Sequence, residues 1–186
     1  IINAMETDGQ KIIREMFKND QSEVIFYKQM THHLLHLDLG FLSRTCNVIL
    51  TRNPKNMVAS FSKVIKNPEL SDLGYIEQVK LLEYLQKNNL PVMVVDSFGF
   101  IKSPEKTMRL LCEKLEISFF DSMLSWVAGA IPEDGVWAKY WYKNVHQSTG
   151  FNLPHSNKIQ LSIQNELLVE KCIPFYDKLM TNSILL

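Results

Sequence analysis

The stretch Val48-Ile-Leu-Thr-Arg-Asn-Pro-Lys-Asn-Met-Val-Ala-Ser-Phe61 decides the fold that this sequence predicts. It begins inside the run 46–51, which is almost wholly apolar, as expected of a parallel strand with both faces covered. Pro54 suits the first turn of a helix. One apolar face of that helix is then predicted from Met57, Val58, Phe61, Val64 and Ile65. The stretch is therefore a strand-to-helix turn, with Arg52 at the carboxyl end of the strand.

Three kinds of hydrogen-bond donor are expected to meet at this turn. Arg52 leaves the strand at the rim of the sheet, where parallel sheets bind ligands. The free N–H groups at the start of the next helix favour anions. Ser60 lies about two turns further on, and helical side chains lean back towards the N-terminus. The turn is thus a candidate phosphate-binding site, and the simpler alternative is a solvated arginine beside a surface serine.

The rest of the chain alternates strand-like and helical segments. Two more strands are predicted at 23–27 and 91–95, and Thr31 is a plausible N-cap for a helix to Leu39 that Gly40 stops. Further helices are expected over residues 1–18, with a break at Asp8-Gly9, and over 75–88, 103–115, 119–127 and 157–180, with a kink or restart at Pro174. This alternation predicts an α/β fold, a parallel sheet with helices on both faces.

Length and composition narrow the class of protein. The 186 residues fit one domain, and 46% hydrophobic residues are enough for a core. A net charge of zero argues against a nucleic-acid partner. No apolar run is long enough for a membrane span and no signal peptide is visible, so a cytoplasmic location is expected. The three cysteines at 46, 112 and 172 show no zinc-site spacing, so we expect buried free thiols and no metal.

The turn from Val48 to Phe61 resembles the 3′-phosphate-binding motif of the sulfotransferase family, in which a strand ends in Arg and a Ser follows eight residues later. The stretches 134–137 and 140–151 resemble a sulfotransferase-like branch of P-loop proteins. The resemblance implies that Arg52 and Ser60 hold the 3′-phosphate of 3′-phosphoadenosine 5′-phosphosulfate (PAPS). It also implies transfer of the sulfuryl group to a hydroxyl or amine of a small-molecule acceptor.

The resemblance further implies a P-loop nucleotide-binding fold. The family holds the 5′-phosphosulfate on a Gly- and Ser-rich P-loop after its first strand, and residues 1–186 contain no such loop. The sequence is therefore interpreted as a single sulfotransferase-like domain over 1–186, whose first strand and P-loop lie upstream of the given chain.

Sulfuryl transfer needs a base for the acceptor hydroxyl, and a histidine is the usual choice. Lys28 matches the family's lysine after the preceding strand and would stabilise negative charge, but Met30 stands where the family has its histidine. His32 and His33 follow closely, and either is a candidate base. The alternative is a solvated helical face, since His32 and His36 are four residues apart.

The loop-rich segment 129–157 is predicted to close over the nucleotide. Lys143, Ser148 and Thr149, together with His146, are its candidate nucleotide-binding residues. In the alternative interpretation Trp137, Trp141 and Phe151 anchor the loop to the core, and its polar residues face water.

Two other functions remain possible from the sequence. The first is a non-catalytic nucleotide-binding or interaction domain of the P-loop superfamily, which the missing P-loop and the displaced histidine favour. The second is a relative of the P-loop kinases, which needs a Walker lysine and magnesium ligands that do not appear in this sequence.

Overall fold

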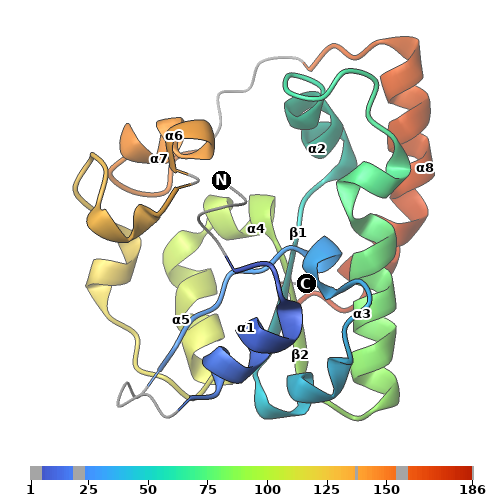
Figure 1. The fold of residues 1–186 in the computed structure, drawn as a ribbon. Coiled ribbons are helices and arrows are strands. Elements are labelled where there is room, and N and C mark those ends of the chain that lie inside the picture. The colour runs from blue at the N-terminus through green and yellow to red at the C-terminus, as the bar shows by residue number, and fades with distance from the viewer. Residues whose placement is uncertain (1–5, 19–23, 137, 154–158, 186) are drawn as a thin grey trace.

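The computed structural model describes residues 6–18, 24–136, 138–153 and 159–185. Two strands and a series of helices follow one another along this part of the chain (Figure 1). The strands are β1 (Asn47–Thr51) and β2 (Val92–Asp96). The α-helices are α1 (Gly9–Met16), α2 (Pro54–Phe61), α3 (Tyr75–Lys87), α4 (Ser97–Lys102), α5 (Pro104–Lys114), α6 (Ala138–Trp141), α7 (Lys143–His146) and α8 (Ile163–Met180). Short 3₁₀ helices are η2 (Thr31–Leu34), η3 (Leu39–Arg44), η4 (Leu70–Leu73), η5 (Asp121–Leu124) and η6 (Pro132–Asp134).

The sheet of the described residues consists of β1 and β2, which pair in parallel from Asn47 opposite Val92 to Thr51 opposite Asp96. The chain returns to β2 near its C-terminal end, where the N–H of Ile184 donates to the carbonyl of Val94 at 3.0 Å. The predicted parallel α/β class is thus confirmed. Because the strands are parallel, both carboxyl ends lie at the same rim, where α2 and α4 begin.

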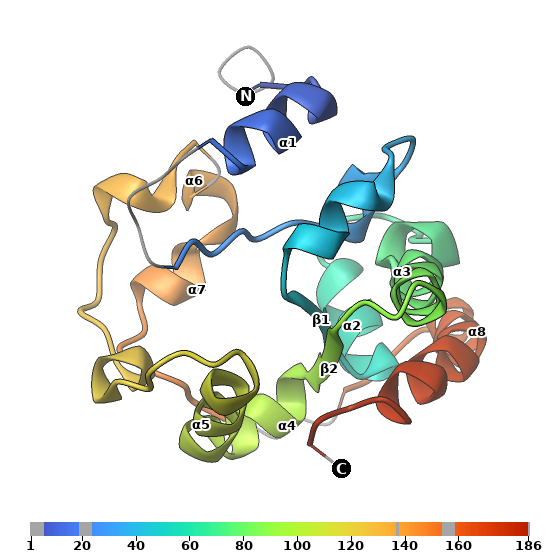
Figure 2. The same cartoon turned by 90° about the horizontal axis from the view of Figure 1, so that it is seen from below.

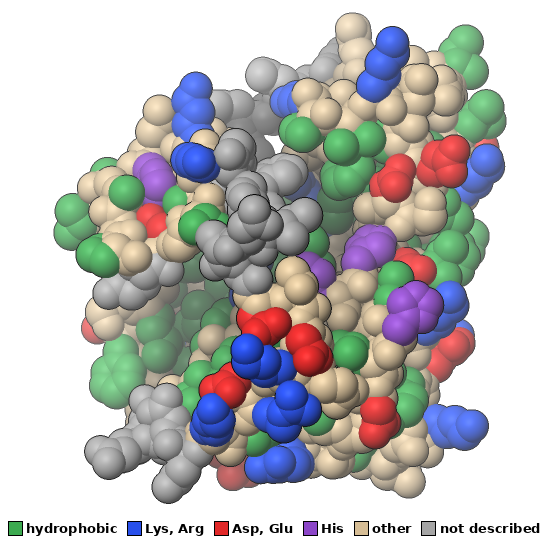
Figure 3. Space-filling view, viewed as in Figure 1, with side chains coloured by type: hydrophobic (Ala, Val, Ile, Leu, Met, Phe, Trp, Pro, Cys, Tyr) green, Lys and Arg blue, Asp and Glu red, His purple; other side chains and the backbone are tan. Residues whose placement is uncertain are grey.

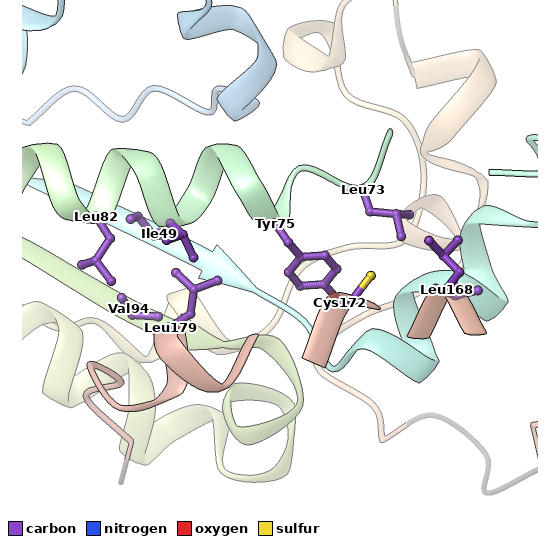
Figure 4. Packing of buried hydrophobic residues seen from close by; sticks show 10 residues of the cluster. Ile49, Leu73, Tyr75, Leu82, Val94, Leu168, Cys172 and Leu179 are labelled. Carbon is purple, nitrogen blue, oxygen red and sulfur yellow. The ribbon is translucent and has the colours of Figure 1, made fainter. Parts of the chain in front are cut away.

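The hydrophobic core lies between one face of this sheet and the pair of helices α3 and α8, which contact each other (Figure 4). Ile49 and Val94 are opposite each other in the sheet and point to this side. Leu82 of α3 and Leu179 of α8 are fully buried against them. Burial of an aliphatic side chain of this size contributes about 1.5–3 kcal/mol, so this cluster fixes how both helices sit on the sheet.

The other face of the sheet is covered unevenly. Met93 and Val95 of β2 are buried, and α4 and α5 lie on that side of β2 (Figures 1 and 2). Their neighbours on β1 are exposed, with Val48 41% and Leu50 61% accessible. Cover of the second face therefore extends over β2 but not over β1 in the part of the chain that the structure describes.

The prediction of a strand at 23–27 is wrong for residues 24–27, the part that the structure describes. Residues 24–30 form an extended segment that leads into η2 (Figures 1 and 2), and they pair with no strand of the described residues. Phe26 is 86% exposed. An extended run of β-prone residues becomes a strand only where a neighbour satisfies its backbone, and residue 23 lies outside the described residues.

Several helix predictions also need correction. The helix predicted from Thr31 to Leu39 is only the turn η2, because His36 adopts a left-handed backbone with φ of 66° that a right-handed helix cannot include. Gly40 lies inside η3 instead of ending a helix. The helix after Pro54 ends at Phe61, so Val64 and Ile65 are exposed.

Near the C-terminal end, the helix predicted over 119–127 is reduced to η5. The last helix begins at Ile163 and continues through Pro174 without a restart, because Leu168, Cys172 and Leu179 are buried on both sides of the proline. The predicted start at 157 lies outside the described residues. Cys112 and Cys172 are buried free thiols as predicted, whereas Cys46 is exposed.

Within the described ranges, no helix combines the length and the apolar character needed to cross a membrane.

Replacement of Leu82 by Ala tests whether the α3–α8 cluster stabilises the fold. Leu82 is fully buried, so Leu82→Ala is expected to lower the free energy of unfolding by roughly 2–5 kcal/mol. Lys80→Ala, on the exposed side of the same helix, should change it by less than about 0.5 kcal/mol. Urea denaturation followed by circular dichroism measures both. Equal effects of the two variants would contradict the assigned core.

Candidate functional site

The turn between β1 and α2 is built by its own sequence. Asn53 is the N-cap of α2, and its side-chain oxygen accepts the N–H of Lys55 at 3.1 Å. Pro54 follows at the first helical position, as predicted, where its missing N–H costs nothing. The chain therefore leaves the strand at Arg52 and starts a helix two residues later, as the sequence predicted.

The two sides of α2 have different surroundings. Pro54 and Val58 are buried, and Phe61 packs against the core. Asn56 is half-buried and Ser60 is exposed, and their four-residue spacing places them together on the opposite side of the helix. Arg52 precedes Asn56 by the same four residues and lies directly after the end of β1, at the rim of the sheet. We call Arg52, Asn56 and Ser60 the rim face.

The rim face presents hydrogen-bonding groups that the described residues leave unused. Neither the guanidinium of Arg52 nor the hydroxyl of Ser60 has a hydrogen-bond or ion-pair partner in the described part of the chain. In the first turn of α2, Pro54 has no N–H and the N–H of Lys55 donates to the side chain of Asn53. The N–H of Asn56 is therefore the first-turn donor that has no hydrogen-bond partner among the described residues. Sequence reasoning missed Asn56, although its spacing from Arg52 and Ser60 was the available signal.

Tyr75 holds the backbone of Arg52. Its hydroxyl donates to the carbonyl of Arg52 at 2.5 Å, and its side chain is fully buried at the start of α3. Burial raises the pKa of Tyr75 well above its ordinary value. The hydroxyl therefore keeps its proton and remains a donor at neutral pH, which fixes the position of the arginine at the rim.

Asp96 stands at the equivalent end of β2, directly opposite Thr51. It is the N-cap of α4, where its carboxylate accepts the N–H of Gly99 at 2.8 Å. Its other oxygen accepts the hydroxyl of Tyr176 at 3.1 Å. Asp96 is only 6% exposed, so its carboxylate is a buried acceptor that links the end of β2 to α4 and α8.

His32 is hydrogen-bonded to the segment 71–75, which also contacts the backbone of Arg52. Its Nε2 is 2.9 Å from the carbonyl of Ser71, which can only accept, so Nε2 carries the hydrogen. The neutral ring then has Nδ1 free of a proton. Because Tyr75 lies four residues after Ser71, the segment 71–75 contacts both the His32 side chain and the backbone carbonyl of Arg52.

Gly74 allows this close approach. Its φ of 73° lies in the left-handed region, and an added Cβ would be 3.2 Å from the Thr31 hydroxyl and 3.3 Å from the His32 ring. A larger residue would be strained and would push the histidine away.

The structure places the other two predicted catalytic residues elsewhere. His33 is exposed, and its Nδ1 is 3.0 Å from the side-chain oxygen of Gln29. Lys28 lies over the ring of Tyr142, with its Nζ 5.8 Å from the ring centroid. Lys28 is thus directed towards the segment between α6 and α7, whereas His32 faces α3.

The predicted nucleotide-binding residues of the loop have structural partners. The hydroxyl of Ser148 accepts the indole N–H of Trp126 at 3.1 Å and donates to the carbonyl of Val145 at 2.8 Å. The carbonyl of Thr149 accepts the backbone N–H of Trp126. Lys143 is exposed at the start of α7. A nucleotide-binding role for these three residues stays a prediction.

Aromatic packing attaches this loop to the rest of the molecule. Phe151 contacts Phe100 of α4 edge-on, with ring centroids 4.9 Å apart, and contacts Trp126 at 5.2 Å. The predicted anchoring role of Phe151 is therefore confirmed. Trp137 lies outside the described residues.

A family model described as a sulfotransferase domain matches residues 1–183, so this chain belongs to the sulfotransferase family. The resemblance seen in the sequence is thus confirmed.

Two curated relatives come from Arabidopsis thaliana. Branched-chain-amino-acid aminotransferase-like protein 1 is 37% identical over 98% of this chain, and protein 2 is 35% identical over 95%. These alignments cover 33% and 32% of the two plant proteins, so the chain spans about a third of their length. No solved structure matches.

The Tyr176–Asp96 contact predicts a loss of stability at alkaline pH. Burial, with a further contribution from Asp96, raises the pKa of Tyr176 to about 12, above the value near 10 of an unfolded chain. The stabilisation of the folded state that results from this raised pKa is complete below about pH 10. It is lost as the pH rises towards 12, because the tyrosine ionises first in the unfolded chain. Tyr176→Phe should therefore lose less stability between pH 9 and about 11 than the unchanged protein.

Urea denaturation at both pH values measures this difference. Tyr84→Phe is the matched control, since Tyr84 is a half-buried tyrosine of α3 whose hydroxyl has no hydrogen-bond partner within the described ranges. Equal losses in the unchanged protein and in Tyr176→Phe would contradict the raised pKa of Tyr176.

Proposed function

We propose that this chain is the 3′-phosphate-binding part of a sulfotransferase that transfers the sulfuryl group of PAPS to a hydroxyl or amine of a small molecule. The observation that carries the proposal is the rim face. A guanidinium without a partner among the described residues, a first-turn N–H and a serine hydroxyl follow each other at four-residue spacing, directly after the strand end. Membership of the sulfotransferase family supports it.

The rim face suits a phosphate group for physical reasons. A guanidinium forms two parallel hydrogen bonds to a phosphate, and the start of a helix attracts negative charge. The hydrogen bond from Tyr75 fixes the Arg52 backbone, so less conformational freedom is lost when the anion binds. Arg52 would carry most of the binding energy, with Asn56 and Ser60 selecting the orientation.

His32 is the better candidate for the base. Its tautomer leaves Nδ1 able to accept the proton of an acceptor hydroxyl, and the bond to Ser71 holds the ring in place. Bound PAPS would supply the sulfuryl group and the leaving phosphate. Lys28 would stabilise the negative charge that develops, after moving from the ring of Tyr142. Lys143, Ser148 and Thr149 would close over the nucleotide.

The proposal needs a P-loop for the 5′-phosphosulfate. Residues 1–186 contain no Gly- and Ser-rich turn after a strand, so this loop would come from another part of the whole protein. The exposed face of β1, with Val48 and Leu50, is where a further strand and helix of a P-loop fold would pack.

A non-catalytic nucleotide-binding domain is the second candidate. The position of Lys28 over Tyr142 and the methionine in place of the family's histidine favour it. Both candidates require the rim face to bind the nucleotide, and they differ only in turnover.

Binding of the 3′-phosphate is tested by calorimetry on the longest natural form of the protein. Arg52→Ala should weaken binding of 3′-phosphoadenosine 5′-phosphate by about 30- to 1000-fold, the loss of a charged pair worth roughly 2–4 kcal/mol. Adenosine 5′-phosphate, which lacks the 3′-phosphate, should bind equally weakly to both proteins. Arg14→Ala removes the same charge from the exposed surface of α1 and should bind normally. Unchanged binding by Arg52→Ala would rule out the rim face as the phosphate site.

The base is tested by turnover. His32→Gln should lower kcat by about 100-fold or more, because it removes proton transfer, and should leave nucleotide affinity unchanged. His33→Gln is the matched control and should retain activity. The assay follows release of 3′-phosphoadenosine 5′-phosphate from PAPS with a panel of small hydroxyl and amine compounds. Turnover unaffected by His32→Gln would eliminate this base, and no turnover by the unchanged protein, despite binding, would support the non-catalytic candidate.

A further inference from the structure

A second group of polar side chains lies away from the rim face, in the segment 126–146. The Nε2 of His146 in α7 and a carboxylate oxygen of Asp134 in η6 are 2.8 Å apart. Their side chains are 24% and 16% exposed, so the pair is largely shielded by the loop around it. The predicted catalytic residues do not include this pair.

Asp134 has a second hydrogen bond that favours its charged form. The same oxygen of Asp134 accepts the backbone N–H of Ile131 at 3.0 Å. This bond, assisted by His146, holds the pKa of the Asp134 carboxyl below its ordinary value. Asp134 is therefore an anion that accepts the Nε2 hydrogen of His146. In the neutral imidazole the other nitrogen, Nδ1, is then a hydrogen-bond acceptor.

The pair lies at the wall of a pocket of about 550 Å³. This volume falls within the range of roughly 300–1,000 Å³ that is usual for small-molecule sites. Apolar side chains form most of the rest of its lining, namely Ala130, Ile131, Pro132, Val136 and Ala138. A smaller recess of about 290 Å³ shares Ile131, Asp134 and His146 and extends to Trp126.

Apolar side chains around the pair remain open to solvent. Val127 is 89% exposed, Ile131 57% and Val145 52%. Figure 3 shows a histidine and an acidic group in the region of α6 and α7, bordered by hydrophobic side chains. A fixed polar acceptor beside such groups is the usual design of a small-molecule site, since apolar contacts supply affinity and one polar contact sets orientation.

We propose that the Asp134–His146 pocket binds a small, uncharged, mainly apolar compound that carries one hydrogen-bond donor, and that this donor binds Nδ1 of His146. Asp134 and Lys139 of the lining carry opposite charges, so the pocket has no excess of positive charge, whereas the rim face has the guanidinium of Arg52. The pocket is built from η6, α6 and α7, whereas the rim face belongs to β1 and α2. The two proposals therefore stand or fail independently.

Fluorine NMR at pH 8 tests the pocket with two probes, 4-fluorophenol and 4-fluoroanisole. They have nearly the same shape, but only the phenol can donate a hydrogen bond. The protein should bind the phenol about fivefold more tightly than the ether, the value of one hydrogen bond of roughly 1 kcal/mol. His146→Leu should reduce phenol binding to the level of the ether. His33→Leu, which changes an exposed histidine elsewhere, should leave it unchanged.

The comparison of the two probes on the unchanged protein does not depend on whether any variant folds. Equal binding of phenol and ether, or no binding of either, would overturn the proposal. Full retention of the preference for phenol in folded His146→Leu would also overturn it. Because no nucleotide is present, none of these results bears on the rim face.

Discussion

The hydrogen bond from Tyr75 to the carbonyl of Arg52 links the hydrophobic core to the rim of the sheet. The tyrosine ring belongs to the cluster that joins α3, α8 and both strands, while its hydroxyl reaches the turn before α2. A buried hydroxyl needs a partner, and the strand end supplies it. The same turn, 71–75, accepts the hydrogen bond of His32. The core thus sets where the arginine and the histidine lie relative to one another.

The sheet is stabilised more on one face than on the other. Ile49 and Val94 are buried beneath α3 and α8, and β2 is also covered on its second face. Val48 and Leu50 leave the second face of β1 open among the described residues. The chain spans about a third of the length of the two curated plant relatives.

The two proposed sites use separate sets of polar groups. For the rim face we propose an anion as ligand, because it has a cation together with backbone and hydroxyl donors. For the Asp134–His146 pocket we propose a neutral hydrogen-bond donor, because an imidazole bound to a carboxylate lies there among apolar side chains. Lys28 precedes η2 in the chain, and its side chain lies over the ring of Tyr142 next to α7.

The sequence by itself determined the elements whose signals are local. The apolar run before Thr51, the helix start at Pro54, the periodicity of α3 and the strand predicted at 91–95 all follow from neighbouring residues. These elements were predicted correctly, with the last strand observed one residue further on, at Val92–Asp96. The position of Arg52 and Ser60 also followed, because both are set by one strand and one helix. The family resemblance was readable for the same reason.

Only the tertiary structure decided the features that depend on distant partners. Residues 24–27 have β-prone side chains but no neighbouring strand in the described part, and α8 passes through Pro174 because buried residues on both sides hold it. The tautomer of His32 depends on Ser71, 39 residues away, and Asp134 and His146 meet across a folded loop. Such contacts join residues whose separation in sequence carries no periodic signal, so their pairing becomes visible only when the chain is folded.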